Sequence, residues 1–166
     1  MKKTITAITL IVIAVLTLPF PHKIKQTYPA IEYRIGYPDY IDRELTITVK
    51  GVYKDYLIKK DTFEGIVSVD KYDFTQDTLM SKVTIFDGKG NLSYFNMETL
   101  GFIIPEKDFS KFFIGVSEPI AEPGQSWSGG DGLVIAAPAS TREEAIEITK
   151  ELAKKSQWLS QSDWVE

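Results

Sequence analysis

Apolar and polar residues alternate along much of the chain between residues 43 and 137, and this period of two limits the fold more than any other feature. Leu45, Ile47 and Val49 alternate with polar neighbours, which is typical of a strand that buries one face. The same pattern covers residues 63–69, and shorter strands are predicted at 101–104, 112–116 and 133–137. A stretch of Gly, Asp and Asn at 87–91 separates two further apolar runs and predicts a β-hairpin.

The pattern changes near the C-terminus, where residues 141–156 are predicted to form a helix. Ser140 and Glu143 have the spacing of a capping box. Glutamates at the start of this segment and lysines at its end complement the helix dipole. We therefore predict an α+β fold. An antiparallel sheet of five to seven strands carries one C-terminal helix on a face and is preceded by an N-terminal hydrophobic helix.

The N-terminus has the order of an export signal. Lys2 and Lys3 are followed by the uncharged, largely apolar residues 4–20, a basic leader before an apolar run. As a helix this run would be roughly 25 Å long, close to the thickness of a bilayer core. The residues after it are poor in the small side chains that signal cleavage requires. We expect an uncleaved signal anchor at residues 1–20, with a cleaved signal peptide as the alternative.

Three segments follow from this interpretation. After the anchor, residues 21–42 are predicted to be a juxtamembrane linker, because Pro21, Pro29 and Pro38 break regular structure. Residues 43–166 are expected to form the β-rich domain. The predicted location is the cell membrane, crossed once through residues 4–20, with the C-terminal domain outside; a secreted protein is the alternative.

Composition excludes several kinds of chemistry. The chain has no Cys and a single His, so disulfides, thiolate metal sites and a Cys nucleophile are impossible. The formal net charge of −4 argues against nucleic acid as a partner. No motif predicts a cofactor, a metal site or a catalytic residue.

The candidate binding residues lie in a Gly-rich loop before the last predicted strand: Trp127, Ser128, Gly129, Gly130 and Asp131. A loop of this composition with one aromatic ring can hold a sugar ring or a peptide, and loops often carry function. The loop lacks the Lys of a phosphate-binding P-loop. The alternative is a plain connection with Trp127 tucked into the core.

The sequence favours a non-enzymatic binding module for an envelope protein, peptide or glycan. One alternative is a hydrolase of envelope glycans that uses two carboxylates facing each other across a cleft. Its candidates are Asp61, Glu64, Asp70, Asp73 and Asp77. The other alternative is a carrier of a small apolar ligand, which needs a cavity of at least about 300 Å³ inside a barrel.

Overall fold

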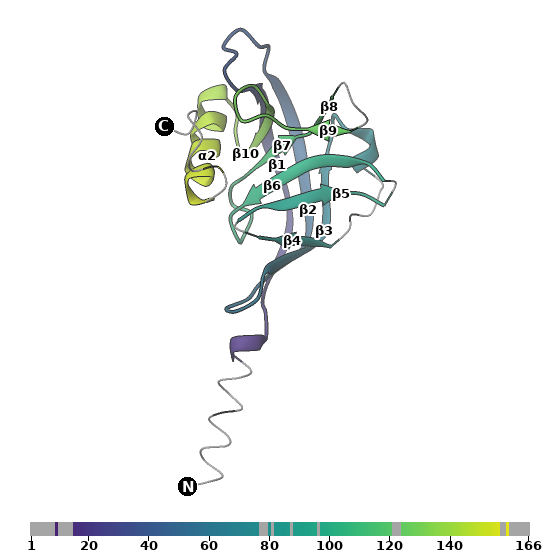
Figure 1. The fold of residues 1–166 in the computed structure, drawn as a ribbon, viewed down its shortest axis with the longest axis vertical. Helices are drawn as coiled ribbons and strands as arrows, with labels where there is room; N and C mark the ends of the chain where they lie inside the picture. The colour runs from purple at the N-terminus through teal and green to yellow at the C-terminus, as the bar shows by residue number, and fades with distance from the viewer. Residues whose placement is uncertain are drawn as a thin grey trace.

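The protein is an antiparallel β-barrel that is nearly closed, with one helix packed on its outer face (Figure 1). This computed structural model describes residues 9, 15–76, 80, 82–86, 88–95, 97–120, 124–156 and 159. The main sheet has eight strands in the order β4-β3-β2-β1-β10-β7-β6-β5. They are β1 (Phe20–Arg34), β2 (Arg43–Asp55), β3 (Asp61–Val69), β4 (Val83–Ile85), β5 (Gly90–Ser93), β6 (Thr99–Pro105), β7 (Phe112–Val116) and β10 (Leu133–Ala137). The remaining elements are β8 (Glu118–Pro119), β9 (Gln125–Ser126), the 3₁₀ turn η1 (Asp73–Thr75) and α2 (Arg142–Lys155).

Each strand of the main sheet lies beside its neighbour along the chain, and β10 returns to pair with β1. The two edge strands β4 and β5 are joined by a tight turn. Phe86 and Lys89 exchange backbone hydrogen bonds of 2.8 and 3.0 Å across it. A further bridge joins Met80 to Tyr94. The hairpin predicted around residues 87–91 is therefore present, and it brings the two edges of the barrel together.

The prediction of five to seven strands is too low, because the main sheet has eight. The added strand is β1, which occupies much of the segment that the prolines suggested was a linker. On the N-terminal side of Ile31, β1 is hydrogen-bonded to β2 alone, and its other edge has no partner strand among the described residues. Proline is tolerated in strands where one edge is unpaired, because its missing N–H then costs no ladder bond. Pro21 and Pro29 lie in this half-paired stretch.

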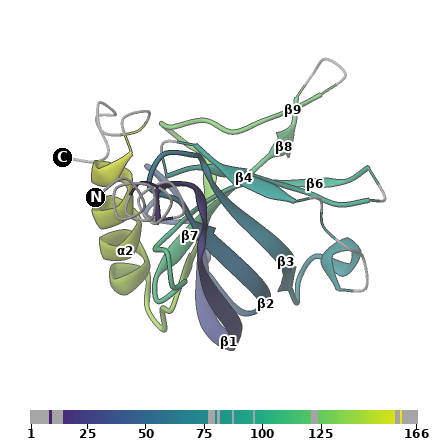
Figure 2. The same ribbon diagram turned by 90° about the horizontal axis from the view of Figure 1, so that it is seen from below.

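Side chains fill the inside of the barrel. Phe63, Phe109 and Phe112 are fully buried there, with ring centroids 4.9 Å apart for Phe63–Phe109 and 5.7 Å for Phe109–Phe112. A second core lies outside the sheet, where α2 covers β1, β10 and β7 (Figure 2). The C-terminal helix is thus confirmed. It begins after Thr141, whose side chain accepts a hydrogen bond from the backbone N–H of Glu144.

The predicted N-terminal hydrophobic helix lies mostly outside the described residues, which include only Thr9 and residues 15–20 of that segment. Residues 15–17 form a helical turn, and β1 begins at Phe20. Among the residues that the structure describes, no helix is both long enough and apolar enough to cross a membrane.

Adding a methyl group at Gly51 is expected to lower the free energy of unfolding by about 1–3 kcal/mol, the usual cost of overpacking. Gly51 faces Gly65 across β2 and β3. A Cβ on Gly51 would lie 2.5 Å from the Glu64 carbonyl oxygen and 2.8 Å from the Phe63 ring. Denaturant unfolding of Gly51→Ala measures this loss. Gly130→Ala is the control, since its nearest neighbouring atom would be 4.0 Å away, and an equal loss in both variants would contradict the expectation.

Candidate functional site

A concave surface of about 430 Å³, here called the trough, lies on the outside of the barrel next to the loop proposed from the sequence. Its floor is formed by β5 and β6, and the arm of β8 and β9 forms its wall. Figure 2 shows this arm projecting on the side of the barrel away from α2. The lining combines amides, hydroxyls, two aromatic rings and one cation: Lys89, Asn91, Ser93, Thr99, Gly101, Phe102, Ser117, Gln125, Ser126 and Trp127.

Trp127 is half-buried at the wall of the trough. Its ring stands edge-on to Phe102, with the centroids 5.0 Å apart and the planes at 87°. Its indole Nε1 donates a 3.0 Å hydrogen bond to the carbonyl oxygen of Leu133. A Cβ on Gly132 would lie 2.5 Å from that nitrogen, so the close packing of the ring requires glycine there. Trp127 therefore has a structural role in addition to any contact with a ligand.

Lys89 lies at the other side of the same aromatic pair. Its Nζ is 4.7 Å from the centre of the Phe102 ring, a cation–π distance. Partial burial lowers the pKa of Lys89, because desolvation disfavours the charged ammonium. The trough thus presents a cation, the partly exposed Trp127 ring and neutral hydrogen-bonding groups within one concavity, with the buried Phe102 ring beneath them.

Of the five residues proposed from the sequence, only Trp127 lines the trough. The next four, Ser128 to Asp131, form a turn that packs toward the start of the β1–β2 loop. The Ser128 carbonyl oxygen accepts a 2.8 Å bond from the N–H of Gly132, and the Ser128 hydroxyl accepts one from the N–H of Gly130 at 3.3 Å. These residues hold the shape of the loop, and their role in binding stays a prediction.

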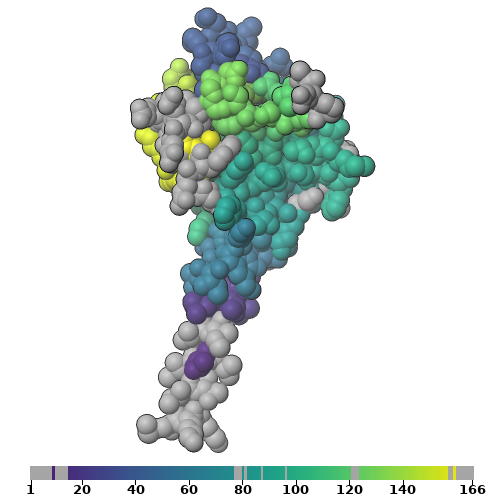
Figure 3. All heavy atoms as spheres, viewed as in Figure 1, coloured from purple at the N-terminus to yellow at the C-terminus, as the bar shows by residue number. Residues whose placement is uncertain are grey.

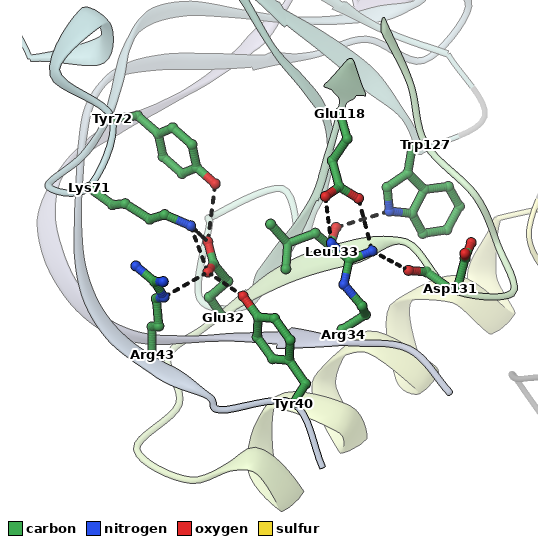
Figure 4. Close-up of polar contacts among 10 residues, drawn as sticks. All are labelled: Glu32, Arg34, Tyr40, Arg43, Lys71, Tyr72, Glu118, Trp127, Asp131 and Leu133. Atoms are coloured by element: carbon green, nitrogen blue, oxygen red, sulfur yellow. Dashed lines mark hydrogen bonds and ion pairs between the residues drawn. The ribbon is translucent and has the colours of Figure 1, made fainter. Parts of the chain in front are cut away.

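Arg34 at the end of β1 fixes both ends of the segment 117–132 (Figure 4). Its guanidinium donates to both carboxylate oxygens of Glu118, at 3.1 and 2.5 Å. It also donates to the carbonyl oxygen of Asp131 at 2.8 Å. The hydrogen bonds to Glu118 raise the pKa of Arg34 further. A two-point contact of this kind sets orientation as well as distance, so Arg34 positions the arm that walls the trough.

A buried carboxylate lies beside this contact. Glu32 in β1 is 0% exposed, and no other acidic side chain in the described part of the chain is buried. Lys71 donates to its two oxygens at 2.7 and 2.6 Å. The hydroxyls of Tyr40 and Tyr72 each donate at 3.1 Å (Figure 4). Burial, followed by the charge of Glu32, raises the pKa of both tyrosines. The carboxylate is therefore surrounded by donors and ties β1 to the segment before η1.

Glu32 and Arg34 were not predicted as site residues, because the prolines of their segment predict a linker and not a strand. The available signal was alternation: Tyr28, Ala30 and Glu32 occupy every second position of β1 and are all buried. The residues of β5 and β6 that line the trough belong to segments predicted only as strands, and no motif singled them out. These residues form a concave surface only together with Gln125, Ser126 and Trp127, which lie far from them in the chain.

The structure does not bring the four described candidate acids, Asp61, Glu64, Asp70 and Asp73, into one cleft. Asp61 and Asp70 lie at opposite ends of β3, roughly 30 Å apart for a strand of this length. Both accept hydrogen bonds from backbone N–H groups, and Glu64 is paired with two lysines. Asp73 begins η1, and Asp77 lies outside the described residues. Within the described residues, no group of three His, Cys, Asp or Glu side chains is arranged to hold a metal ion.

Comparison of this chain with protein-family models, with curated proteins and with solved structures finds no match in any of the three.

Lys71→Met is expected to lower the free energy of unfolding by about 3 kcal/mol, because it removes the nearest counter-charge and two hydrogen bonds from a buried carboxylate and leaves only Arg43, 3.8 Å away. The double variant Glu32→Gln/Lys71→Met is expected to lose less than the sum of the single variants. Denaturant unfolding of the four proteins measures the coupling. Glu64→Gln, in an exposed ion pair, should change stability far less; additive losses at Glu32 and Lys71 would contradict a coupled pair.

Truncating the indole is expected to destabilise the protein by about 2 kcal/mol, since Trp127→Ala removes both the Phe102 contact and the bond to Leu133. Thermal unfolding measures this effect. Trp127→Phe retains a ring and should recover part of the loss. Unchanged stability of Trp127→Ala would show that the ring contributes nothing to the fold.

Proposed function

We propose that this protein is a non-enzymatic binding module, tethered outside the cell membrane through residues 4–20, that holds a polar envelope glycan in the trough. The observation that carries the proposal is the composition of the trough lining. Asn91 and Gln125 are exposed and offer amides that both donate and accept hydrogen bonds. The half-buried Trp127 supplies aromatic surface beside them, and the buried Phe102 ring supports it from below.

A glycan suits this lining better than an apolar ligand does. Hydroxyl groups along a sugar chain need both donors and acceptors, which the amides and the hydroxyls of Ser93 and Thr99 provide. The trough is open to solvent, so it suits part of a polymer chain better than an enclosed small molecule. An envelope peptide or protein shares part of this chemistry, and it is the alternative occupant that the binding experiment below separates.

The alternative functions have less support. A hydrolase needs two carboxylates facing across a cleft. Asp61 and Asp70 are separated along β3, and Glu32 and Glu118 are each bound by a cation. A carrier needs an interior cavity, whereas Phe63, Phe109 and Phe112 occupy the middle of the barrel. The proposal of a membrane tether is based on the apolar run at residues 4–20 of the sequence. Secretion is the alternative.

Replacing a trough amide is expected to weaken glycan binding without unfolding the protein. Asn91→Ala and Gln125→Ala each remove one or two hydrogen bonds of about 0.5–1.5 kcal/mol, equivalent to roughly two- to tenfold in Kd per bond. Calorimetric titration with an N-acetylglucosamine tetrasaccharide, and co-sedimentation with purified cell-wall polysaccharide, measure binding.

Gln26→Ala is the matched control, since Gln26 is an exposed amide on β1 away from the trough. Amide chemical-shift changes on adding the tetrasaccharide should map to β5, β6 and the β8–β9 arm. Equal weakening by the Gln26 and trough variants would count against the trough, as would shift changes confined to another surface. Binding of wall peptides alone would reassign the ligand class.

A further inference from the structure

Exposed apolar side chains gather at the end of the barrel where β1 begins. Leu57 and Ile58, in the loop between β2 and β3, are 58% and 62% exposed, and Phe86 at the β4–β5 turn is 64% exposed. Leu18 and Phe20 are also exposed. A cluster of exposed apolar groups on one end of a small domain marks a contact surface. We call residues 56–60 together with Phe86 the tip.

The tip lies directly beside the point where the apolar N-terminal run enters the sheet. Phe20 pairs with Asp55 in the β1–β2 ladder, so residues 56–60 begin one position beyond that pair. Figures 1 and 3 show the β2–β3 loop next to the N-terminal segment at the narrow end of the molecule. β1 begins at Phe20, the last residue of that run. If residues 4–20 enter a bilayer, the pairing of Phe20 with Asp55 holds the tip next to the membrane surface.

Lysines surround these apolar side chains. The Nζ of Lys60 is 4.2 Å from the centre of the Phe86 ring, and that of Lys59 is 5.8 Å from the Tyr56 ring. Lys59, Lys60 and Lys107 line one hollow of about 480 Å³ at this end together with Asp61 and Glu106. Lys107 is paired with Asp55 at 2.8 Å, so Lys59 and Lys60 are the cations of this hollow that remain for a partner. Apolar and aromatic groups beside lysines are the usual composition of protein surfaces that lie in the headgroup region of anionic membranes.

We propose that the tip docks on the surface of an anionic lipid bilayer. Leu57 and Ile58 enter the boundary between headgroups and acyl chains, and Lys59 and Lys60 meet the headgroup phosphates. The net charge of the whole chain is −4, so the attraction comes from the local placement of these lysines and not from overall charge. This inference rests on the tether of the proposed function and does not depend on the trough.

The chain has no cysteine, so single labels can be placed without removing any. The full-length protein carrying Ile58→Cys, labelled with an environment-sensitive fluorophore, is reconstituted into vesicles of phosphatidylglycerol and phosphatidylcholine with nitroxide-labelled lipid. Ile41→Cys is the matched control. Ile41 is 84% exposed and lies in the β1–β2 loop, the length of β2 away, or roughly 40 Å.

We expect lipid nitroxide to quench the label at position 58 at least threefold more strongly than the label at 41, and aqueous iodide to show the reverse order. Leu57→Cys provides a second position if the first variant folds poorly. Equal and weak quenching by lipid at 57, 58 and 41 would overturn the proposal. The exposed apolar groups would then be left for a protein partner.

The role of the lysines is tested by charge reversal. Lys59→Glu/Lys60→Glu should reduce lipid quenching at position 58 at least twofold in vesicles containing phosphatidylglycerol. Lys50→Glu/Lys154→Glu changes the net charge equally at exposed positions outside the tip and should leave quenching unchanged. An equal reduction by both pairs would overturn the assignment of Lys59 and Lys60 to the headgroups.

Discussion

The hydrogen-bonded ladder between β1 and β10 is the interaction on which the rest of the structure depends. It joins the first strand of the sheet to the last, from Ile31 with Ala136 to Arg34 with Leu133. Without it the meander would be an open sheet with two long edges, which is a liability in water. Closure also creates the two cores. One is the aromatic interior, and the other is the outer apolar surface that α2 covers.

The same strand carries the charges that organise one end of the barrel. Glu32 and Arg34 point from alternate positions of β1, one into a cluster of donors and the other to the arm before β10. A buried carboxylate is costly unless it is paired, so Glu32 fixes the positions of Lys71, Tyr40 and Tyr72 around it. Arg34 in turn holds Glu118 and the Asp131 carbonyl. The wall of the trough is thus set by polar contacts made at the end of one strand.

The two surfaces proposed for binding differ in chemistry as well as in place. The trough has amides and hydroxyls around one aromatic pair, whereas the tip has aliphatic and aromatic groups next to lysines. The lining residues of the trough and of the hollow at the tip do not overlap. One surface can therefore contact a membrane while the other holds a polar ligand, and a variant in one need not disturb the other.

Local periodicity and capping residues were enough to predict the antiparallel sheet, the hairpin around residue 88 and the C-terminal helix. The prediction of a linker at β1 was wrong, because Pro21 and Pro29 lie where one edge of the strand is unpaired. The closure of the barrel, the burial of Glu32 and the assembly of the trough depend on long-range contacts. Each of these features brings together residues far apart in the chain, as the hydrogen bonds between Arg34 and Glu118 do. Local sequence patterns cannot predict such contacts, because they reflect only the neighbours of each residue along the chain.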